Sequence, residues 1–284
     1  MKRFFKEYWL SISALLFMAI IVTCSTRGSV VSLKTGNKNA SVQHVESPQQ
    51  IPLEETFNFI PSPLKNIPEQ ILYRKSYVVS YNKNTKLPNW VAWNLTANHA
   101  NGNVRRSGNA WHEDLEVPFP RAITADYWNS GWSRGHMCPA GDNKWDSEAM
   151  YETFLYTNCC PQNANLNSGV WNQIEMSCRR WAEKYGDIYI VCGPILFRQE
   201  HERIGENRVV VPEAFFKVVI CLNEKPKGIG FICRNTDGGR SKDFYVNSIK
   251  QVERITGMVF FPSLPREESE VIKSQANLRD WDSD

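Results

Sequence analysis

Four polar residues in two segments of the chain could together cleave a phosphodiester bond. Arg134 and His136 lie in the first segment, and Asn167 and Glu175 lie in the second. A histidine with an ordinary pKa of about 6.5 can deprotonate water, and an arginine can bind two non-bridging phosphate oxygens at once. Amide and carboxylate oxygens suit a hard divalent cation such as Mg²⁺, which stabilises the developing charge. These residue types predict metal-assisted phosphodiester hydrolysis if the fold brings the two segments together.

The first segment also contains a G-x-S-x-G sequence, the motif around the nucleophile of many serine hydrolases, with Ser133 at its centre. That motif functions between a buried strand and a helix. Here the preceding residues 126–130 are polar, and Pro139 and Gly141 disfavour a helix immediately afterwards. The next histidine after this region, His201, lies in a charged stretch. A serine hydrolase is therefore the weaker interpretation.

Eight cysteines allow two further interpretations. A zinc site could combine His136 and Cys138 with Cys159 and Cys160, but the sequence has no C-x-x-C pair and adjacent cysteines ligate one ion poorly. Disulfide bonds are compatible with an exported protein. If Cys24 is set aside, seven cysteines remain, so at least one would be a free thiol.

The composition predicts a packed core without a strongly basic surface. The 284 residues are 42% hydrophobic and include 10 Trp and 14 Phe, which is ample for a core. The formal net charge is +3, and Lys2, Arg3 and Lys6 against Glu7 account for +2 of it, which leaves +1 for residues 8–284. Contacts to phosphate groups would therefore require a local basic patch.

The N-terminal part predicts targeting to a cell envelope. Residues 1–24 combine basic residues with a short apolar run, as in a signal peptide, and they end in a lipobox-like sequence at Cys24, although Thr23 departs from its usual small residue. Residues 25–65 are polar and then proline-rich, which indicates a flexible tether to a domain at residues 66–284. We therefore expect an exported protein of the bacterial cell envelope, membrane-anchored through a lipid or its signal segment, or secreted.

The remaining chain alternates strand-like and helix-like segments. Apolar residues recur every three or four positions in one segment, which predicts a long helix, whereas β-branched and aromatic runs predict strands. We expect a hairpin of residues 72–81 with 90–95, a helix at 167–185, and a buried strand at 187–192 that ends at Gly193-Pro194. A strand pair follows at 215–222 with 228–233, and then two helices, one at 241–256 and one from 266 onward. This order indicates an α+β fold.

The sequence resembles the DNA/RNA non-specific endonucleases, the family that includes endonuclease G. The resemblance rests on Arg-Gly-His at 134–136, Thr-Asn-x-x-Pro-Gln at 157–162 and Leu-Asn-x-x-x-Trp-x-x-Ile-Glu at 166–175, and it extends to residues 90–93 and 211–217. It implies the ββα-metal nuclease fold, with a central antiparallel sheet flanked by helices. It also implies Mg²⁺, for which Mn²⁺ could substitute, and cleavage of both DNA and RNA to leave 5′-phosphates.

The resemblance also implies a role for each matching polar residue. Those roles are His136 as general base, Asn167 as the direct Mg²⁺ ligand, Glu175 as the residue holding metal-bound waters, Arg134 and Arg106 (or Arg105) as phosphate-binding residues, and Asn158 as a supporting residue. In the family an Asp usually precedes Arg-Gly-His, and Ser133 occupies that position here. We therefore expect reduced or retuned activity, and a catalytically silent nucleic-acid-binding surface lipoprotein is the alternative.

Overall fold

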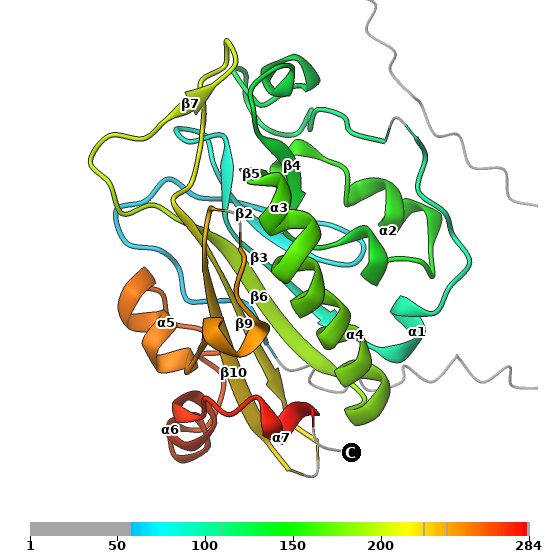
Figure 1. Cartoon of the computed structure of the whole chain (residues 1–284), viewed down its shortest axis with the longest axis vertical. Coiled ribbons are helices and arrows are strands. Elements are labelled where there is room, and N and C mark those ends of the chain that lie inside the picture. The colour runs from blue at the N-terminus through cyan, green and yellow to red at the C-terminus, as the bar shows by residue number, and fades with distance from the viewer. Residues whose placement is uncertain (1–57, 109, 224, 237, 283–284) are drawn as a thin grey trace, which may run out of the picture. The chain divides into compact units, whose positions relative to one another are not determined.

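A seven-stranded antiparallel sheet forms the centre of the computed structural model, which describes residues 58–282 except 109, 224 and 237 (Figure 1). All neighbouring strands in it are antiparallel. In spatial order the strands are β1 (Gln70–Tyr73), β2 (Val78–Asn82), β3 (Leu87–Leu95), β6 (Ile188–Ile195), β9 (Ala214–Cys221), β10 (Lys227–Arg234) and β11 (Val246–Asn247). The predicted strand pair and the α+β class are therefore confirmed. The predicted hairpin is confirmed in β2 and β3, but the strand expected at residues 72–81 is divided into β1 and β2 by a turn in which N of Arg74 donates to the carbonyl of Tyr77.

The central strands β6 and β9 are mostly apolar because both faces of the sheet are covered. In β9, Phe215 and Val219 belong to one hydrophobic core, whereas Phe216 and Val218 belong to the other. This alternation follows from the two-residue period of a strand. Since neither face meets water, a continuous apolar run results instead of an alternating pattern.

Helices cover the two faces. Helix α4 (Asn172–Tyr185) packs Ile174 and Trp181 against the first core, and α5 (Ile249–Thr256) and α6 (Arg266–Ser274) pack against the second (Figure 1). The other helical elements are α1 (Ala97–Ala100), η1 (Thr124–Tyr127), η2 (Ala140–Asp142), α2 (Ser147–Glu152), η3 (Tyr156–Asn158), α3 (Ala164–Leu166), η4 (Asn167–Trp171), η5 (Lys242–Tyr245) and α7 (Arg279–Asp282). Among the described residues no helix is long and apolar enough to cross a membrane.

Two short ribbons project from this framework. Strand β4 (Ser133–His136) pairs with β5 (Cys159–Gln162), and β7 (Arg203–Ile204) pairs with β8 (Val209–Val210). In the β4–β5 ribbon, position 135 has no room for a larger residue than glycine, because a Cβ there would lie 2.2 Å from Oε1 of Gln162. The β4–β5 ribbon carries the Arg-Gly-His sequence to the surface of the domain.

Two further predicted element boundaries are wrong. Strand β6 continues through Gly193-Pro194 to Ile195. Its pairing with β3 ends at Cys192, so Pro194, which has no backbone N–H to donate, removes no hydrogen bond to β3. The helix predicted at residues 241–256 begins only after Ser248, whose hydroxyl accepts from N of Gln251 while Oε1 of Gln251 accepts from N of Ser248. This capping box starts α5, and η5 and β11 precede it.

The end of the predicted tether belongs to the domain. Residues 58–65 contact it through the backbone N–H of Ser62, which donates to the carbonyl of Val259 at 3.0 Å, and through the Phe59 ring, which packs on Tyr189. Their apolar side chains extend the second core, so the tether prediction was too long at this end. The predicted signal segment and the rest of the tether lie outside the described residues.

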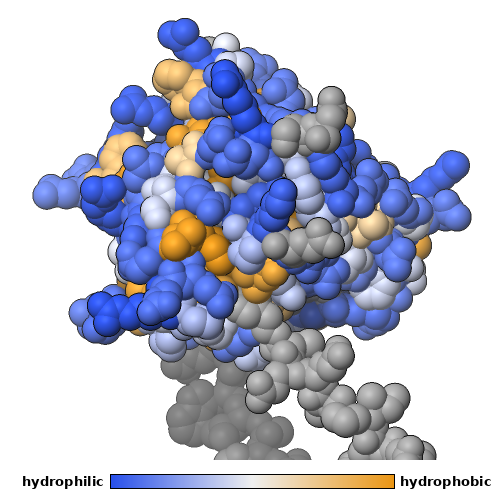
Figure 2. Space-filling view, turned by 90° about the horizontal axis from the view of Figure 1, so that it is seen from below, coloured by the Kyte–Doolittle hydropathy of each residue, from blue (hydrophilic) through white to orange (hydrophobic). Residues whose placement is uncertain are grey.

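The seven cysteines of the described chain are free, buried thiols. All seven side chains belong to the first core, where cysteine acts as a small apolar residue. The surface in Figure 2 is largely hydrophilic, with apolar residues confined to small areas. Most of the apolar content is therefore used inside the domain.

Candidate active site

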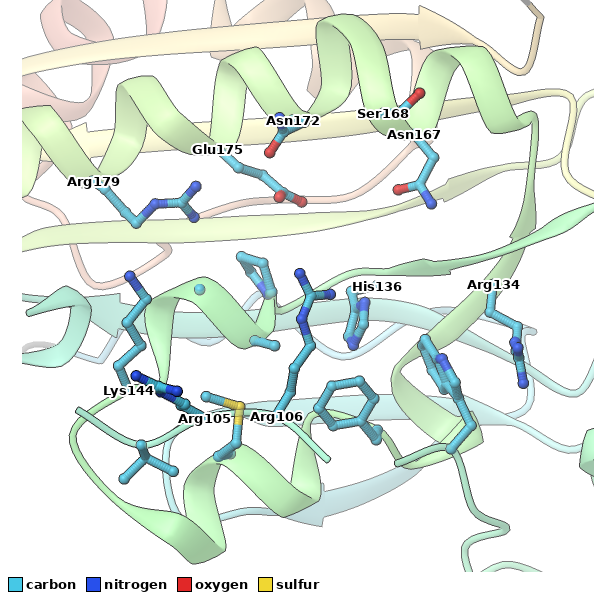
Figure 3. A pocket seen from close by; sticks show the side chains of 17 residues that line it. Arg105, Arg106, Arg134, His136, Lys144, Asn167, Ser168, Asn172, Glu175 and Arg179 are labelled. Atoms are coloured by element: carbon cyan, nitrogen blue, oxygen red, sulfur yellow. The ribbon is translucent and has the colours of Figure 1, made fainter. Parts of the chain in front are cut away.

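A cavity of about 820 Å³ opens between the β4–β5 ribbon and the helical segment from Asn167 through α4 (Figure 3). Both segments singled out in the sequence line it, and its polar walls are strongly basic. Its charged and amide-bearing lining residues are Arg105, Arg106, Arg134, Lys144, Arg179, Asn167, Asn172 and Glu175. Five cationic side chains surround one carboxylate, which is the local basic patch that phosphate binding requires.

His136 stands at the end of β4, with its imidazole in an aromatic pocket. The ring centroid lies 4.4 Å from that of Trp111 and 4.8 Å from that of Phe154, and Nε2 is buried with no hydrogen-bond partner among the described residues. Burial, together with the positive charge of Arg106, lowers the pKa of His136 to about 3. The imidazole is therefore neutral at pH 7, with an unpaired nitrogen that could accept a proton.

Asn158 lies behind this histidine and does not line the cavity. Its Oδ1 accepts from N of Cys138 at 2.9 Å, and its Nδ2 donates to the carbonyls of Cys138 and Thr153, each at 2.8 Å. These buried bonds hold the backbone that follows His136. The geometry is that of a structural support for this segment.

The helical segment that carries Asn167 is not one regular helix. It begins at α3, capped by Asn163, whose side chain accepts from N of Asn165 and Leu166. A π-helical turn, η4, then runs over Asn167–Trp171, with Gly169 at φ −94° and ψ −118°. Asn163 is the N-cap of this segment, so Asn167 does not cap the start of the helix, and Figure 3 shows the Asn167 amide directed into the cleft. Such π turns often occur at functional sites.

Ser133, the first residue of β4, contacts the side chain of Asn167. Its hydroxyl donates to the carbonyl of Gln162 at 2.8 Å and accepts from Nδ2 of Asn167 at 3.4 Å. The serine opens a strand instead of a strand-to-helix turn, and its proton is engaged by a backbone carbonyl. This geometry does not match a serine-hydrolase nucleophile.

Glu175 and Arg179 extend into the cleft from consecutive turns of α4 (Figure 3). Nη1 of Arg179 donates to Oδ1 of Asp142 at 2.8 Å, and Asp142 is almost completely buried beneath the cleft. Burial raises the pKa of Glu175 to about 7, while the positive charges of Lys217 and Arg179 oppose that shift. Glu175 therefore titrates near neutral pH.

The predicted arginines occupy different parts of the cleft. Arg106 extends toward the space between His136 and Glu175, whereas Arg134 points toward the rim (Figure 3), where its guanidinium carbon lies 5.8 Å from the Trp111 ring centroid. Arg105 also lines the cavity. Because Arg106 depresses the pKa of His136, it is the better match of the two adjacent arginines for a phosphate near the base.

Lys144, Arg179 and Trp111 are among the residues of the cleft that sequence reasoning missed. Arg179 could have been found, since it follows Glu175 by four positions on a helix and so shares its face. Lys144 and Trp111 come from irregular segments, so no periodicity points to them.

The donor chemistry of the cleft fits a hard cation held mostly by water. Asn167 and Glu175 present an amide oxygen and a carboxylate from one helical segment, opposite the unpaired imidazole nitrogen of His136 (Figure 3). In the described part of the chain no three His, Cys, Asp or Glu residues converge as in a zinc site. A cation with one or two protein ligands and several waters is typical of Mg²⁺.

The chain is similar to several curated nucleases. It is 36% identical over 210 residues to "Nuclease EXOG, mitochondrial" of Danio rerio, covering 68% of this chain and 61% of that relative. It is 31% identical over 209 residues to "Endonuclease G, mitochondrial" of Bos taurus, covering 69% of this chain and 70% of that relative. It is 30% identical over 230 residues to "Mitochondrial nuclease" of Saccharomyces cerevisiae, covering 72% of this chain and 70% of that relative. The chain spans between 56% and 61% of the length of the EXOG relatives.

These names correct one prediction. The expected location in a bacterial cell envelope is wrong, because the relatives are named as mitochondrial nucleases of animals and yeast. Targeting segments for secretion and for mitochondria can both carry basic and apolar residues, so Lys2, Arg3 and Lys6 with the following apolar run did not distinguish the two destinations.

A solved structure and a family model agree with the relatives. The fold matches a chain in the crystal structure of the EndoG/EndoGI complex, which describes the mechanism of EndoG inhibition, with a TM-score of 0.66, 29% identity and coverage of 70% of this chain and 89% of that chain. A model of the DNA/RNA non-specific endonucleases matches residues 58–267. The chain therefore belongs to the DNA/RNA non-specific endonuclease family, with its ββα-metal fold.

Proposed function

We propose that this protein is a Mg²⁺-dependent endonuclease that hydrolyses phosphodiester bonds of both DNA and RNA. The proposed nuclease domain is residues 66–284, and residues 58–65 pack against it. One observation carries the proposal: His136, Asn167 and Glu175 line one basic cleft, with Arg106 reaching between them (Figure 3).

His136 is the proposed general base, acting through Nε2. The base must be neutral before the reaction, and burial beside Arg106 keeps the imidazole neutral at pH 7. A pKa of about 3 is low for a base in the free protein. A phosphodiester bound at Arg106 would offset that cation and raise the pKa of His136, so substrate binding would make the imidazole a stronger base.

Asn167 and Glu175 are the proposed binding site for Mg²⁺. The amide oxygen of Asn167 would be the direct protein ligand, and the carboxylate of Glu175 would accept hydrogen bonds from the waters of the ion. A bound Mg²⁺ would polarise the scissile phosphate and neutralise charge on the leaving oxygen. Ser133, which accepts from Nδ2 of Asn167, leaves Oδ1 of Asn167 directed toward the cleft.

The cationic side chains would bind and orient the substrate backbone. Arg106 and Arg134 are the proposed phosphate ligands, and Asn158 supports the segment that follows His136. Contacts to phosphate carry no base information, which supports cleavage of DNA and RNA alike. The five cationic side chains that line the cleft supply this attraction.

The test is digestion of supercoiled plasmid DNA and of structured RNA by the purified protein, with Mg²⁺ or with EDTA, followed by labelling of the ends. We expect both substrates to be cut only with Mg²⁺ and to carry 5′-phosphates. Retention of nucleic acid without EDTA-sensitive cleavage would instead support the silent binding protein that Ser133 suggests. Absence of both binding and cleavage would contradict both functions.

A further inference from the structure

Lys217 is a buried cation in the middle of the central strand β9. Its side chain is 1% exposed, and Nζ has no hydrogen-bond partner among the described residues. Its neighbours two positions away on the same face, Phe215 and Val219, belong to the hydrophobic core. An isolated ammonium group in such a place is strongly unfavourable unless a counter-charge or aromatic faces surround it.

Two indole rings and one carboxylate surround this ammonium. Nζ lies 4.5 Å from the ring centroid of Trp171 and 5.4 Å from that of Trp93. Oε1 of Glu175 lies 3.9 Å away, at the outer limit of an ion pair. The rings supply cation–π attraction and form a slot that directs the ammonium toward Glu175.

Glu175 is the carboxylate that remains for Lys217 to pair with. Asp142, a buried acid whose charge also acts on Lys217, already accepts from Nη1 of Arg179 at 2.8 Å and from Nε1 of Trp93 at 3.1 Å. Glu175 lines the cleft, whereas Lys217 does not. The ammonium therefore lies behind the carboxylate, on the side away from substrate.

We propose that Lys217 is a positioning residue that holds the carboxylate of Glu175 in its cleft-facing orientation and compensates its charge from behind. This role rests on the function proposed above, in which Glu175 binds the waters of the metal. It explains why a charged residue occupies a core position of an otherwise apolar strand.

The charges around Glu175 are consistent with this role. Burial raises the pKa of Glu175, and Asp142 in η2 raises it further, whereas Lys217 in β9 and Arg179 in α4 lower it. Burial lowers the pKa of Lys217, but the negative charges of Glu175 and Asp142 oppose burial, and the pKa of Lys217 is raised above its ordinary value. Lys217 comes first among the groups that keep Glu175 ionised.

The test is a double-mutant cycle of Lys217→Met and Glu175→Gln, with single-turnover plasmid cleavage and melting temperature as the two measurements. If Lys217 acts through Glu175, Lys217→Met slows cleavage at least about tenfold in the wild-type background but less than about twofold beside Glu175→Gln. Lys273→Met is the matched control, because Lys273 is also buried and ion-paired, with Glu253 at 2.9 Å, but on the opposite face of the sheet. It should leave the rate unchanged.

Equal losses in both backgrounds, or no loss in either, would overturn the proposal. If Lys217→Met alone fails to fold, the double variant should still fold, because no unpaired Glu175 carboxylate remains; failure of both would contradict the pairing. A wild-type protein that does not cleave would instead refute the proposed function. In that case the coupling in melting temperature would still test the Lys217–Glu175 pair.

Discussion

Ser133 and Asn167 are joined by a hydrogen bond in which Nδ2 of Asn167 donates to Oγ of Ser133 at 3.4 Å. The serine in turn donates to the carbonyl of Gln162 at 2.8 Å, so the helical segment is tied to the β4–β5 ribbon. The residue that resembles a serine nucleophile is thus a support for the proposed metal ligand. The position where the family usually has Asp retains a polar link to the site.

Substitution Ser133→Ala should therefore weaken cleavage without abolishing it. One hydrogen bond contributes about 1 kcal/mol, so we expect a loss of roughly fivefold in rate at limiting Mg²⁺. Initial rates of plasmid nicking measure the effect, and fluorophosphonate labelling of the wild type should be absent. A complete loss of activity together with labelling of Ser133 would show that the serine is a nucleophile after all.

Substitution Asn167→Ala should act mainly through the metal. Removal of the only proposed direct ligand should raise the Mg²⁺ concentration for half-maximal cleavage at least about tenfold, and excess Mg²⁺ should restore part of the rate. Titration of plasmid cleavage against Mg²⁺ measures this shift. An unchanged Mg²⁺ dependence with a lower maximal rate would place the metal elsewhere.

Activity should rise with pH through neutrality because Glu175 must be ionised. Burial raises its pKa from 4.5 to about 7, so the fraction of carboxylate increases as the pH rises past 7. We expect kcat/KM to increase between pH 6 and pH 8 in the wild type and to stay flat, at a lower level, in Glu175→Gln. If the variant keeps the same rise, another group is responsible for it.

The raised pKa of Glu175 should also make the folded protein less stable as the pH rises, whereas activity increases. Folded Glu175 binds its proton more tightly than the unfolded chain does, so its contribution favours folding below pH 4.5 and is lost as the pH rises to about 7. Melting curves of the wild type and Glu175→Gln should therefore diverge in favour of the glutamine variant as the pH increases. Parallel curves would contradict the raised pKa.

Substitution Arg179→Ala should reduce both stability and activity. It removes the charged partner of buried Asp142, and breaking such a pair costs about 3 kcal/mol. Denaturant unfolding measures the stability, and a rise in KM for DNA would show that Arg179 also binds phosphate. The double variant Arg179→Ala with Asp142→Asn should recover part of the stability, since no unpaired carboxylate remains. No recovery would contradict this pairing.

Part of the site could be predicted because its residues lie in regular elements or in a family motif. The apolar spacing of Trp171, Ile174 and Trp181 defined the helix that presents Glu175, and Arg-Gly-His identified the base. The kinked start of that helix could not be predicted, because the π turn at Asn167–Trp171 depends on an irregular Gly169. Apolar periodicity carries no information about such a turn.

The support beneath the cleft could not be predicted because it forms only when distant elements pack. Asp142 meets Arg179 through the contact of η2 with α4, and a Cβ at Gly141 would lie 2.8 Å from Nη1 of Arg179. Lys217 did leave a signal, since it is a lone charge in the apolar run of β9. That signal indicates a buried pair without identifying the partner.

The central claim is that His136 is the base of a nuclease cleft, and single-turnover cleavage of supercoiled plasmid in Mg²⁺ tests it most directly. His201→Ala is the matched control, because His201 pairs with Glu213 at 2.8 Å and does not line the cleft. We predict that His136→Ala slows cleavage about 10²- to 10⁴-fold with an unchanged circular dichroism spectrum, while His201→Ala cleaves within about twofold of the wild type. Cleavage by folded His136→Ala at the wild-type rate would contradict the account.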